Sequence, residues 1–185
     1  MVYNNVRAMV VQSLSVLILC ALIELGAGFT LKEMKRQLVL LPGLIVMVPP
    51  LLDLRGNISG ALASRLGTAL HVGAMEPKLA FTRELKTNVA SSLILSLLAS
   101  ATIGLVSYVM CILTGIETIS LAKLVGIALI AGFVSCLILI AIAVPVAVIS
   151  FKRGLDPDNL TSPLMTTLGD FITVVCIFVA ALVVG

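Results

Sequence analysis

Residues 121–148 read LAKLVGIALIAGFVSCLILIAIAVPVAV, an apolar run that carries a single charge, at Lys123. About 20 apolar residues are enough for a helix to cross a hydrocarbon core of roughly 30 Å, so this stretch can cross a bilayer. The rest of the 185-residue chain is similar, because 60% of its residues are hydrophobic, 11% are charged and the mean hydropathy is +1.22. A soluble domain of this composition would expose large apolar patches. The sequence therefore predicts an all-α, polytopic membrane protein.

Four further segments are predicted to cross the membrane, which gives five crossings in all. They cover residues 8–29, residues 38–52 with a continuation to residue 71, residues 89–113 and residues 162–184. The second of the five is predicted to be interrupted at Pro42-Gly43 and at Pro49-Pro50, because proline removes a backbone donor and glycine favours turns. We expect a single membrane domain over residues 1–185, with no cytoplasmic sensor domain, because five crossings leave no room for a soluble domain.

The first and last segments carry recognisable terminal signals. Arg7 followed by an apolar run imitates a signal peptide, but the run is longer than such a peptide needs and lacks a clean small-residue cleavage site. In the last segment, Pro163 suits the first helical turn, where its missing donor would be unpaired anyway, and Ser162 or Asn159 can cap the helix. Both segments are therefore predicted to be membrane helices of the mature chain.

Basic residues predict the orientation in the membrane. Five crossings put the termini on opposite sides, and cytoplasmic loops carry the excess of lysine and arginine. With the N-terminus in the cytoplasm, eight basic residues lie on the inner side and four on the outer side. The inner set is Arg7, Arg55, Arg65, Lys78, Arg83, Lys86, Lys152 and Arg153, and the outer set is Lys32, Lys35, Arg36 and Lys123. We expect a multi-pass plasma-membrane protein with a cytoplasmic N-terminus, an outside C-terminus and no nucleic-acid partner.

Asp170 is the main functional candidate, because it is a lone carboxylate about a third of the way into the last apolar segment. A charge near the middle of a bilayer costs about 2.5 to 3.5 kcal/mol on insertion scales and normally faces a wet path, an ion or a partner. A polar stripe at helical spacing contains it: Pro163, Thr166, Thr167, Asp170 and Thr173. The stripe either lines an ion path or packs against a helix, with Asp170 paired to an arginine or protonated.

A divalent cation is a suitable ligand for such a carboxylate. Mg²⁺ prefers oxygen ligands, keeps several of its waters and is usually held through one or two carboxylates. One carboxylate per chain is too few, but a homodimer axis would bring two copies of Asp170 together. Two close carboxylates repel when the site is empty and favour an ion that neutralises both. The four cysteines lie in apolar segments without metal-ligand spacing, so we expect packing roles for them.

Residues 54–71 have helical periodicity, many small residues and no strong apolar face. Small residues let helix backbones approach closely in membranes. Carbonyl groups freed near a proline or glycine break are tolerated at membrane depth where they line protein or a wet cavity. We therefore expect this stretch to adjoin the ion path.

Two separate motifs resemble the MgtE and solute carrier family 41 magnesium transporters. The first is in residues 38–73, with Gly56-Asn57, ASRLGT at residues 63–68 and His71. The second is DPDNLTSP at residues 156–163, followed by Leu168-Gly169-Asp170, and is most similar to the solute carrier branch. The resemblance covers nearly the whole chain. It implies an MgtE-like transmembrane domain of five helices that acts as a homodimer and carries Mg²⁺ at or near the two-fold axis.

The resemblance also implies metal-site residues. Asp170 matches the family aspartate that holds the hydrated ion, the carbonyl group one turn earlier falls at Thr166, and Gly56-Asn57 approaches the same path. Asp53 stands where solute carrier members have a small uncharged residue. It is either an extra inner ligand at the pore mouth or the ion-pair partner of Arg55.

Glu24 is a further candidate in the outer part of the first segment. It either receives ions from outside or reaches the membrane interface near Lys32 or Lys35. Solute carrier members join two units in one chain, and this sequence holds one, so we expect the second unit to come from another copy. Bacterial MgtE proteins close their pore with N-terminal cytoplasmic sensor domains, and that regulation is not expected in cis here.

An enzymatic function is not expected. Leu168-Gly169-Asp170 is similar to the glycine-aspartate motif of intramembrane aspartyl proteases, but these enzymes need a second membrane aspartate and a tyrosine partner, which are missing. The remaining hypothesis is a divalent cation channel or transporter that prefers Mg²⁺ as the transported ion. Two alternatives stay open, a Na⁺-coupled Mg²⁺ exchanger and a non-conducting accessory membrane subunit.

Overall fold

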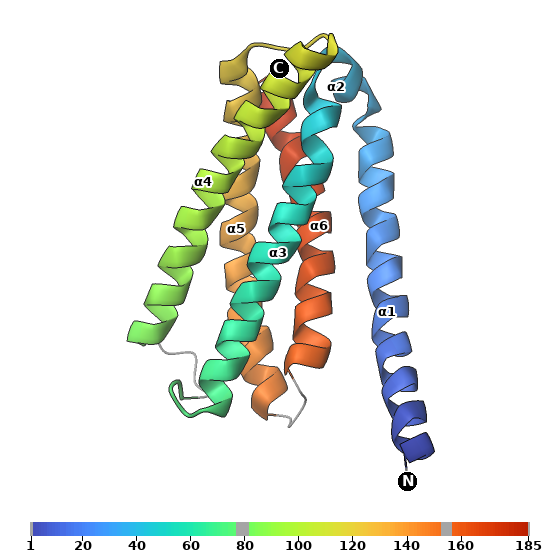
Figure 1. Cartoon of the computed structure of the whole chain (residues 1–185), viewed down its shortest axis with the longest axis vertical. Coiled ribbons are helices and arrows are strands. Elements are labelled where there is room, and N and C mark those ends of the chain that lie inside the picture. The colour runs from blue at the N-terminus through green and yellow to red at the C-terminus, as the bar shows by residue number, and fades with distance from the viewer. Residues whose placement is uncertain (1, 77–81, 153–156, 185) are drawn as a thin grey trace.

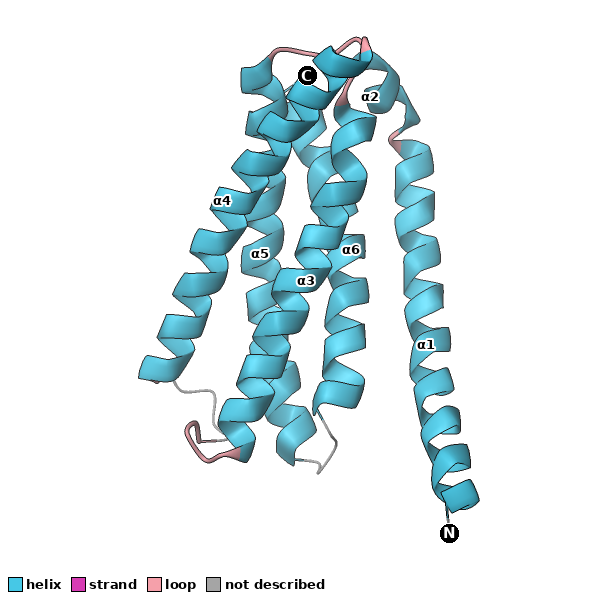
Figure 2. Ribbon diagram, in the orientation of Figure 1, coloured by secondary structure: helices cyan, strands magenta, loops and turns pink. Residues whose placement is uncertain are grey.

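The computed structural model of the chain describes residues 2–76, 82–152 and 157–184. These residues form six α-helices and no strand (Figure 2). The helices are α1 (Val2–Glu33), α2 (Lys35–Leu40), α3 (Leu44–His71), α4 (Arg83–Thr114), α5 (Leu121–Lys152) and α6 (Pro157–Val184). The predicted all-α class is confirmed.

Four helices of the described chain are long and apolar enough to cross a membrane. They are the Ser13–Glu33 part of α1, all of α4 and α5, and the Pro163–Val184 part of α6. The protein is therefore a multi-pass membrane protein. A fifth crossing, by α3, stays a prediction; α3 runs along the bundle in contact with α4, α5 and α6, and the two chain ends lie at opposite ends of the bundle (Figure 1).

The predicted interruption of the second segment is wrong at one of its two positions. The chain leaves the helix between α2 and α3, where Gly43 has a φ of 89° that favours glycine. In contrast, α3 continues without a break through Pro49 and Pro50. Both prolines are exposed and lie in the second turn of α3, so each removes one hydrogen bond at the surface of the helix near its start.

The last helix begins earlier than the sequence suggested. Helix α6 starts at Pro157, which takes the first position, where no backbone donor is needed. Pro163 is consequently inside the helix and not in its first turn. Ser162 and Asn159 lie within α6, and their side chains are outside the described residues.

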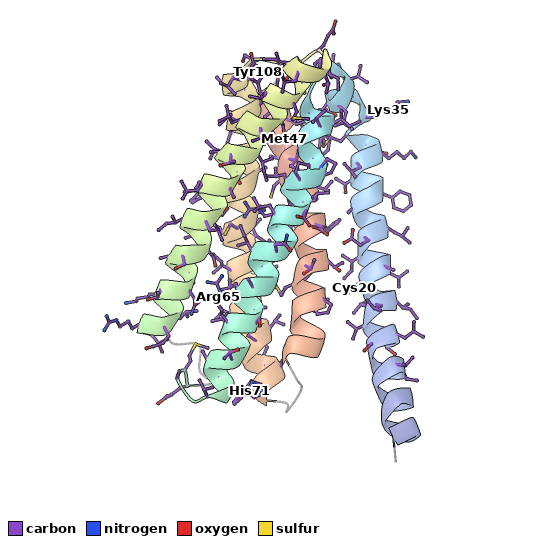
Figure 3. The ribbon with its side chains drawn as sticks, viewed as in Figure 1. Cys20, Lys35, Met47, Arg65, His71 and Tyr108 are labelled. Atoms are coloured by element: carbon purple, nitrogen blue, oxygen red, sulfur yellow. The ribbon has the colours of Figure 1, made fainter. Side chains whose placement is uncertain are left out.

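The bundle interior consists of two apolar clusters with polar residues between them. On α3 the first cluster ends at Leu51 and the second begins at Leu62, and on α5 the boundary lies between Ala131 and Leu139. Buried polar side chains occupy the interval on four helices: Arg55, Ser59, Ser92, Ser96, Ser100, Ser135, Thr167 and Thr173. We call this set the central polar layer. Lys35 lies at the end that holds α2, and Arg65 and His71 lie toward the opposite end of α3 (Figure 3).

We predict that Gly43→Ala lowers the free energy of unfolding by about 1 to 3 kcal/mol, because an alanine is strained at positive φ. Its Cβ would also lie 3.0 Å from the Cβ of Thr118. Unfolding in detergent micelles measures the effect. Gly126→Ala is the matched control, since a Cβ at Gly126 meets nothing within 4 Å; equal stability of the two variants would contradict the prediction.

Candidate functional site

Helices α3 and α6 approach each other closely at Gly56. A Cβ on Gly56 would lie 2.8 Å from Cγ2 of Thr166 and 3.8 Å from Oδ1 of Asp170. The Thr166 hydroxyl donates a long hydrogen bond of 3.5 Å to the Gly56 carbonyl oxygen. The structure therefore brings together three of the residues that the sequence placed on one path.

A second contact, one turn further along α3, supports this arrangement. The Ser59 hydroxyl donates to the Arg55 carbonyl oxygen at 2.7 Å and lies 3.1 Å from the Met165 carbonyl oxygen of α6. A Cβ on Gly169 would lie 3.1 Å from Oγ of Ser59. Ser59 was not among the predicted site residues. Its position one helical turn from Gly56-Asn57 is a signal that could have identified it.

The Asp170 side chain is half-buried and has a carboxyl group as its neighbour. Its Oδ1 atom is buried and has no hydrogen-bond partner. The Glu24 carboxyl group of α1 lies close to Asp170, and Asp53 of α3 adds further negative charge. The alternative in which an arginine pairs with Asp170 is not what the structure has, because Arg55 of the adjacent α3 turns away toward α4.

Glu24 reaches Asp170 because α1 packs on α6. A Cβ on Gly26 would lie 3.3 Å from Cε2 of Phe171, so this glycine lets the α1 backbone approach the phenyl ring next to Asp170. The sequence left open whether Glu24 receives ions or lies near Lys32 or Lys35. The structure places Glu24 beside Asp170. The pairing depends on the tertiary contact between α1 and α6, which no local sequence pattern reports.

Asn57 and Asp53 lie one turn apart on the exposed side of α3. The Asn57 amide donates to Oδ2 of Asp53 at 3.1 Å. The predicted pairing of Asp53 with Arg55 is wrong, because residues two apart on a helix point in different directions. Arg55 is only 1% exposed and donates to the Ser100 hydroxyl at 3.0 Å. Arg55 also does not belong to an inner loop, where the charge count had placed it.

The charges of this site do not form a compact metal cage. Among the described residues there is no group of three or more histidine, cysteine, aspartate or glutamate side chains that could bind a metal ion directly. Glu24, Asp53 and Asn57 are exposed, so the acidic site is open on that side of the chain. An open acidic site of this kind suits a cation that keeps its water shell and is held through its waters.

The chain matches one family model and several known proteins. The MgtE family model, described as a divalent cation transporter, matches residues 48–180. Solute carrier family 41 member 3 of Rattus norvegicus is 29% identical over 136 residues, which cover 70% of this chain and 29% of that protein. Solute carrier family 41 member 2 of Xenopus laevis is 29% identical over 174 residues, 90% of this chain and 30% of that protein. The chain thus spans about three tenths of the length of these relatives. No solved structure matches.

We predict that Gly56→Ala lowers the free energy of unfolding by about 1 to 3 kcal/mol, because the added methyl group overpacks the contact between α3 and α6. Thr166→Ser removes the Cγ2 atom that the methyl group would meet. The double variant should therefore recover most of the loss, in a double-mutant cycle measured by unfolding in detergent. Additive effects of the two substitutions would show that this contact does not limit the approach of the helices.

Proposed function

This chain belongs to the MgtE family of divalent cation transporters, and we propose that it moves divalent cations, Mg²⁺ in preference, across a membrane with Asp170 as the principal ion-holding group. The observation that carries this proposal is the buried, unpartnered Oδ1 of Asp170 beside the Glu24 carboxyl group. Two carboxyl groups so close together repel each other when ionised. A divalent cation relieves that repulsion more than a monovalent cation does.

The ion is held through its waters. Mg²⁺ gives up water reluctantly, so oxygen atoms around it bind the hydrogen atoms of the hydration shell. Asp170 supplies charge, and the carbonyl oxygens of Thr166 and Gly56 supply neutral acceptors next to it. Asn57 adds an amide at the exposed side, and Asp53 adds negative charge at the mouth. The distances at Gly56 support this grouping, because they bring α3 and α6 together at Asp170.

A second copy of the chain completes the site in this proposal. Glu24, Asp53 and Asn57 are exposed and carry polar groups on a surface that would otherwise face lipid. A two-fold axis next to this surface brings two copies of Asp170 to one ion.

The proposed orientation keeps the N-terminus in the cytoplasm and the C-terminus outside, in the plasma membrane. Arg55 is left out of the count of loop charges, because it is buried in the bundle. The remaining basic residues of the sequence still divide seven to four in favour of the inner side.

We predict that Asp170→Ala lowers Mg²⁺ flux into liposomes by at least about tenfold, as expected for the loss of charge-assisted hydrogen bonds. Asp170→Asn should retain flux but lose discrimination between divalent and monovalent ions, because the amide has no charge. Glu84→Gln is the control, since Glu84 is an exposed carboxylate in the first turn of α4. Full, selective flux in both Asp170 variants would remove this residue from the mechanism.

The same liposomes separate the alternatives. Flux that depends on Asp170 and ignores an opposing Na⁺ gradient indicates a channel, and flux that follows the gradient indicates a Na⁺-coupled exchanger. Wild-type protein that is folded and gives no flux would favour a non-conducting accessory subunit.

We predict that Glu24→Gln weakens Mg²⁺ binding by about three- to tenfold, because the loss of one nearby charge in a partly exposed site is worth about 1 kcal/mol. Isothermal titration of the purified protein in detergent measures the dissociation constant. Glu33→Gln is the matched control, because Glu33 is an exposed carboxylate at the end of the same helix. An unchanged dissociation constant in Glu24→Gln would exclude Glu24 from the ion site.

A further inference from the structure

Arg55 is a buried cation without a counter-charge. Its side chain is 1% exposed and lies in the central polar layer. Nη2 donates to the Ser100 hydroxyl at 3.0 Å, whereas Nε and Nη1 are buried and have no hydrogen-bond partner. No carboxylate in the described part of the chain pairs with it. An arginine stays protonated in proteins, so its charge persists inside the bundle.

An unpaired charge in such a place is strongly destabilising. Removal of a guanidinium group from water carries a penalty of several kcal/mol, which a partner of opposite charge normally offsets. The Cys136 sulfur on α5 lies near the guanidinium group. Its thiol is directed at the Ser92 carbonyl oxygen, 3.7 Å away, as a protonated donor would be. A neutral thiol does not compensate the charge of Arg55.

A small cavity adjoins the guanidinium group. Its volume is about 10 Å³, and its polar lining comes from Arg55, Ser59, Ser92 and Cys136. Apolar side chains from α3 and α5 line the remainder. A space of that order holds one compact occupant about the size of a water molecule. Polyatomic anions such as sulfate are several times larger than a water molecule.

Hydrogen-bond donors dominate this cavity. Nε and Nη1 of Arg55 lack acceptors, and the buried Ser92 hydroxyl also has no partner. Cys136 and Ser59 already direct their donors at backbone carbonyl oxygens. A water molecule would satisfy these donors and leave the positive charge of Arg55 in place. A monovalent anion satisfies the same donors and also neutralises the charge.

We propose that the cavity beside Arg55, between α3, α4 and α5, binds one small monovalent inorganic anion of the chloride class. The anion accepts hydrogen bonds from Arg55 and Ser92 and neutralises the guanidinium group. The site is separate from Asp170 and does not depend on the proposed transport function. It adds an anion to a protein that is otherwise expected to bind cations.

The test is the unfolding temperature of the purified full chain in detergent, in sodium chloride, bromide, gluconate or sulfate at equal ionic strength. Chloride and bromide should raise the unfolding temperature by about 3 to 5 °C at ten times the dissociation constant, because the anion binds only folded protein. Gluconate and sulfate, which are much larger, should give no rise that depends on Arg55, apart from the general stabilisation that sulfate gives to folded proteins. Broadening of the ³⁵Cl NMR signal by the wild-type protein reports binding directly.

Three variants locate the anion. Arg55→Met should abolish both the chloride effect and the broadening, and Ser92→Ala should raise the half-effective chloride concentration several-fold. Ser91→Ala is the matched control, because Ser91 is the exposed neighbour of Ser92, and it should match the wild type. If Arg55→Met does not fold, the comparison of Ser92→Ala with Ser91→Ala still decides. Identical unfolding temperatures in chloride and gluconate, or a chloride effect that survives in Ser92→Ala unchanged, would overturn the proposal.

Discussion

The close approach of the α3 and α6 backbones is the interaction on which the rest of this structure depends. Two glycines make it possible, Gly56 on α3 and Gly169 on α6, and each presents its bare backbone to a side chain of the other helix. Ser59 adds a hydrogen bond across the same contact. Apolar clusters pack on both sides of it. Most of the buried polar side chains of the described residues lie in one layer between these clusters.

Helix geometry keeps Arg55 apart from the carboxylates near this contact. Asp53 and Arg55 are two residues apart on α3, so they point in different directions. Asp53 joins Glu24 and Asp170 on one side of α3, whereas Arg55 reaches Ser100 on α4. An arginine next to Asp170 would neutralise it and remove its preference for a cation. In the proposed mechanism the carboxylates therefore stay available for the transported ion, and Arg55 needs a counter-charge of its own.

Much of this arrangement could be predicted from the sequence, and the failures have physical causes. Composition predicted the membrane class, and the motifs around Gly56 and Asp170 predicted residues that the fold brings together. The start of α6 was misplaced because both Pro157 and Pro163 are compatible with a first turn. Arg55 was counted with the inner loop because the apolar run of the second segment ends at Leu52. The proximity of Glu24 to Asp170 depends on how α1 packs on α6, which lies beyond local periodicity.

The central claim is that Asp170 residues from two copies of the chain hold one hydrated divalent cation. The most direct test is the stoichiometry of Mg²⁺ binding, measured by equilibrium dialysis of the purified protein in detergent, with Asp170→Ala as the blank. We expect one Asp170-dependent ion for every two chains. One Asp170-dependent ion for every chain, or ion binding that is the same in Asp170→Ala, would contradict the claim.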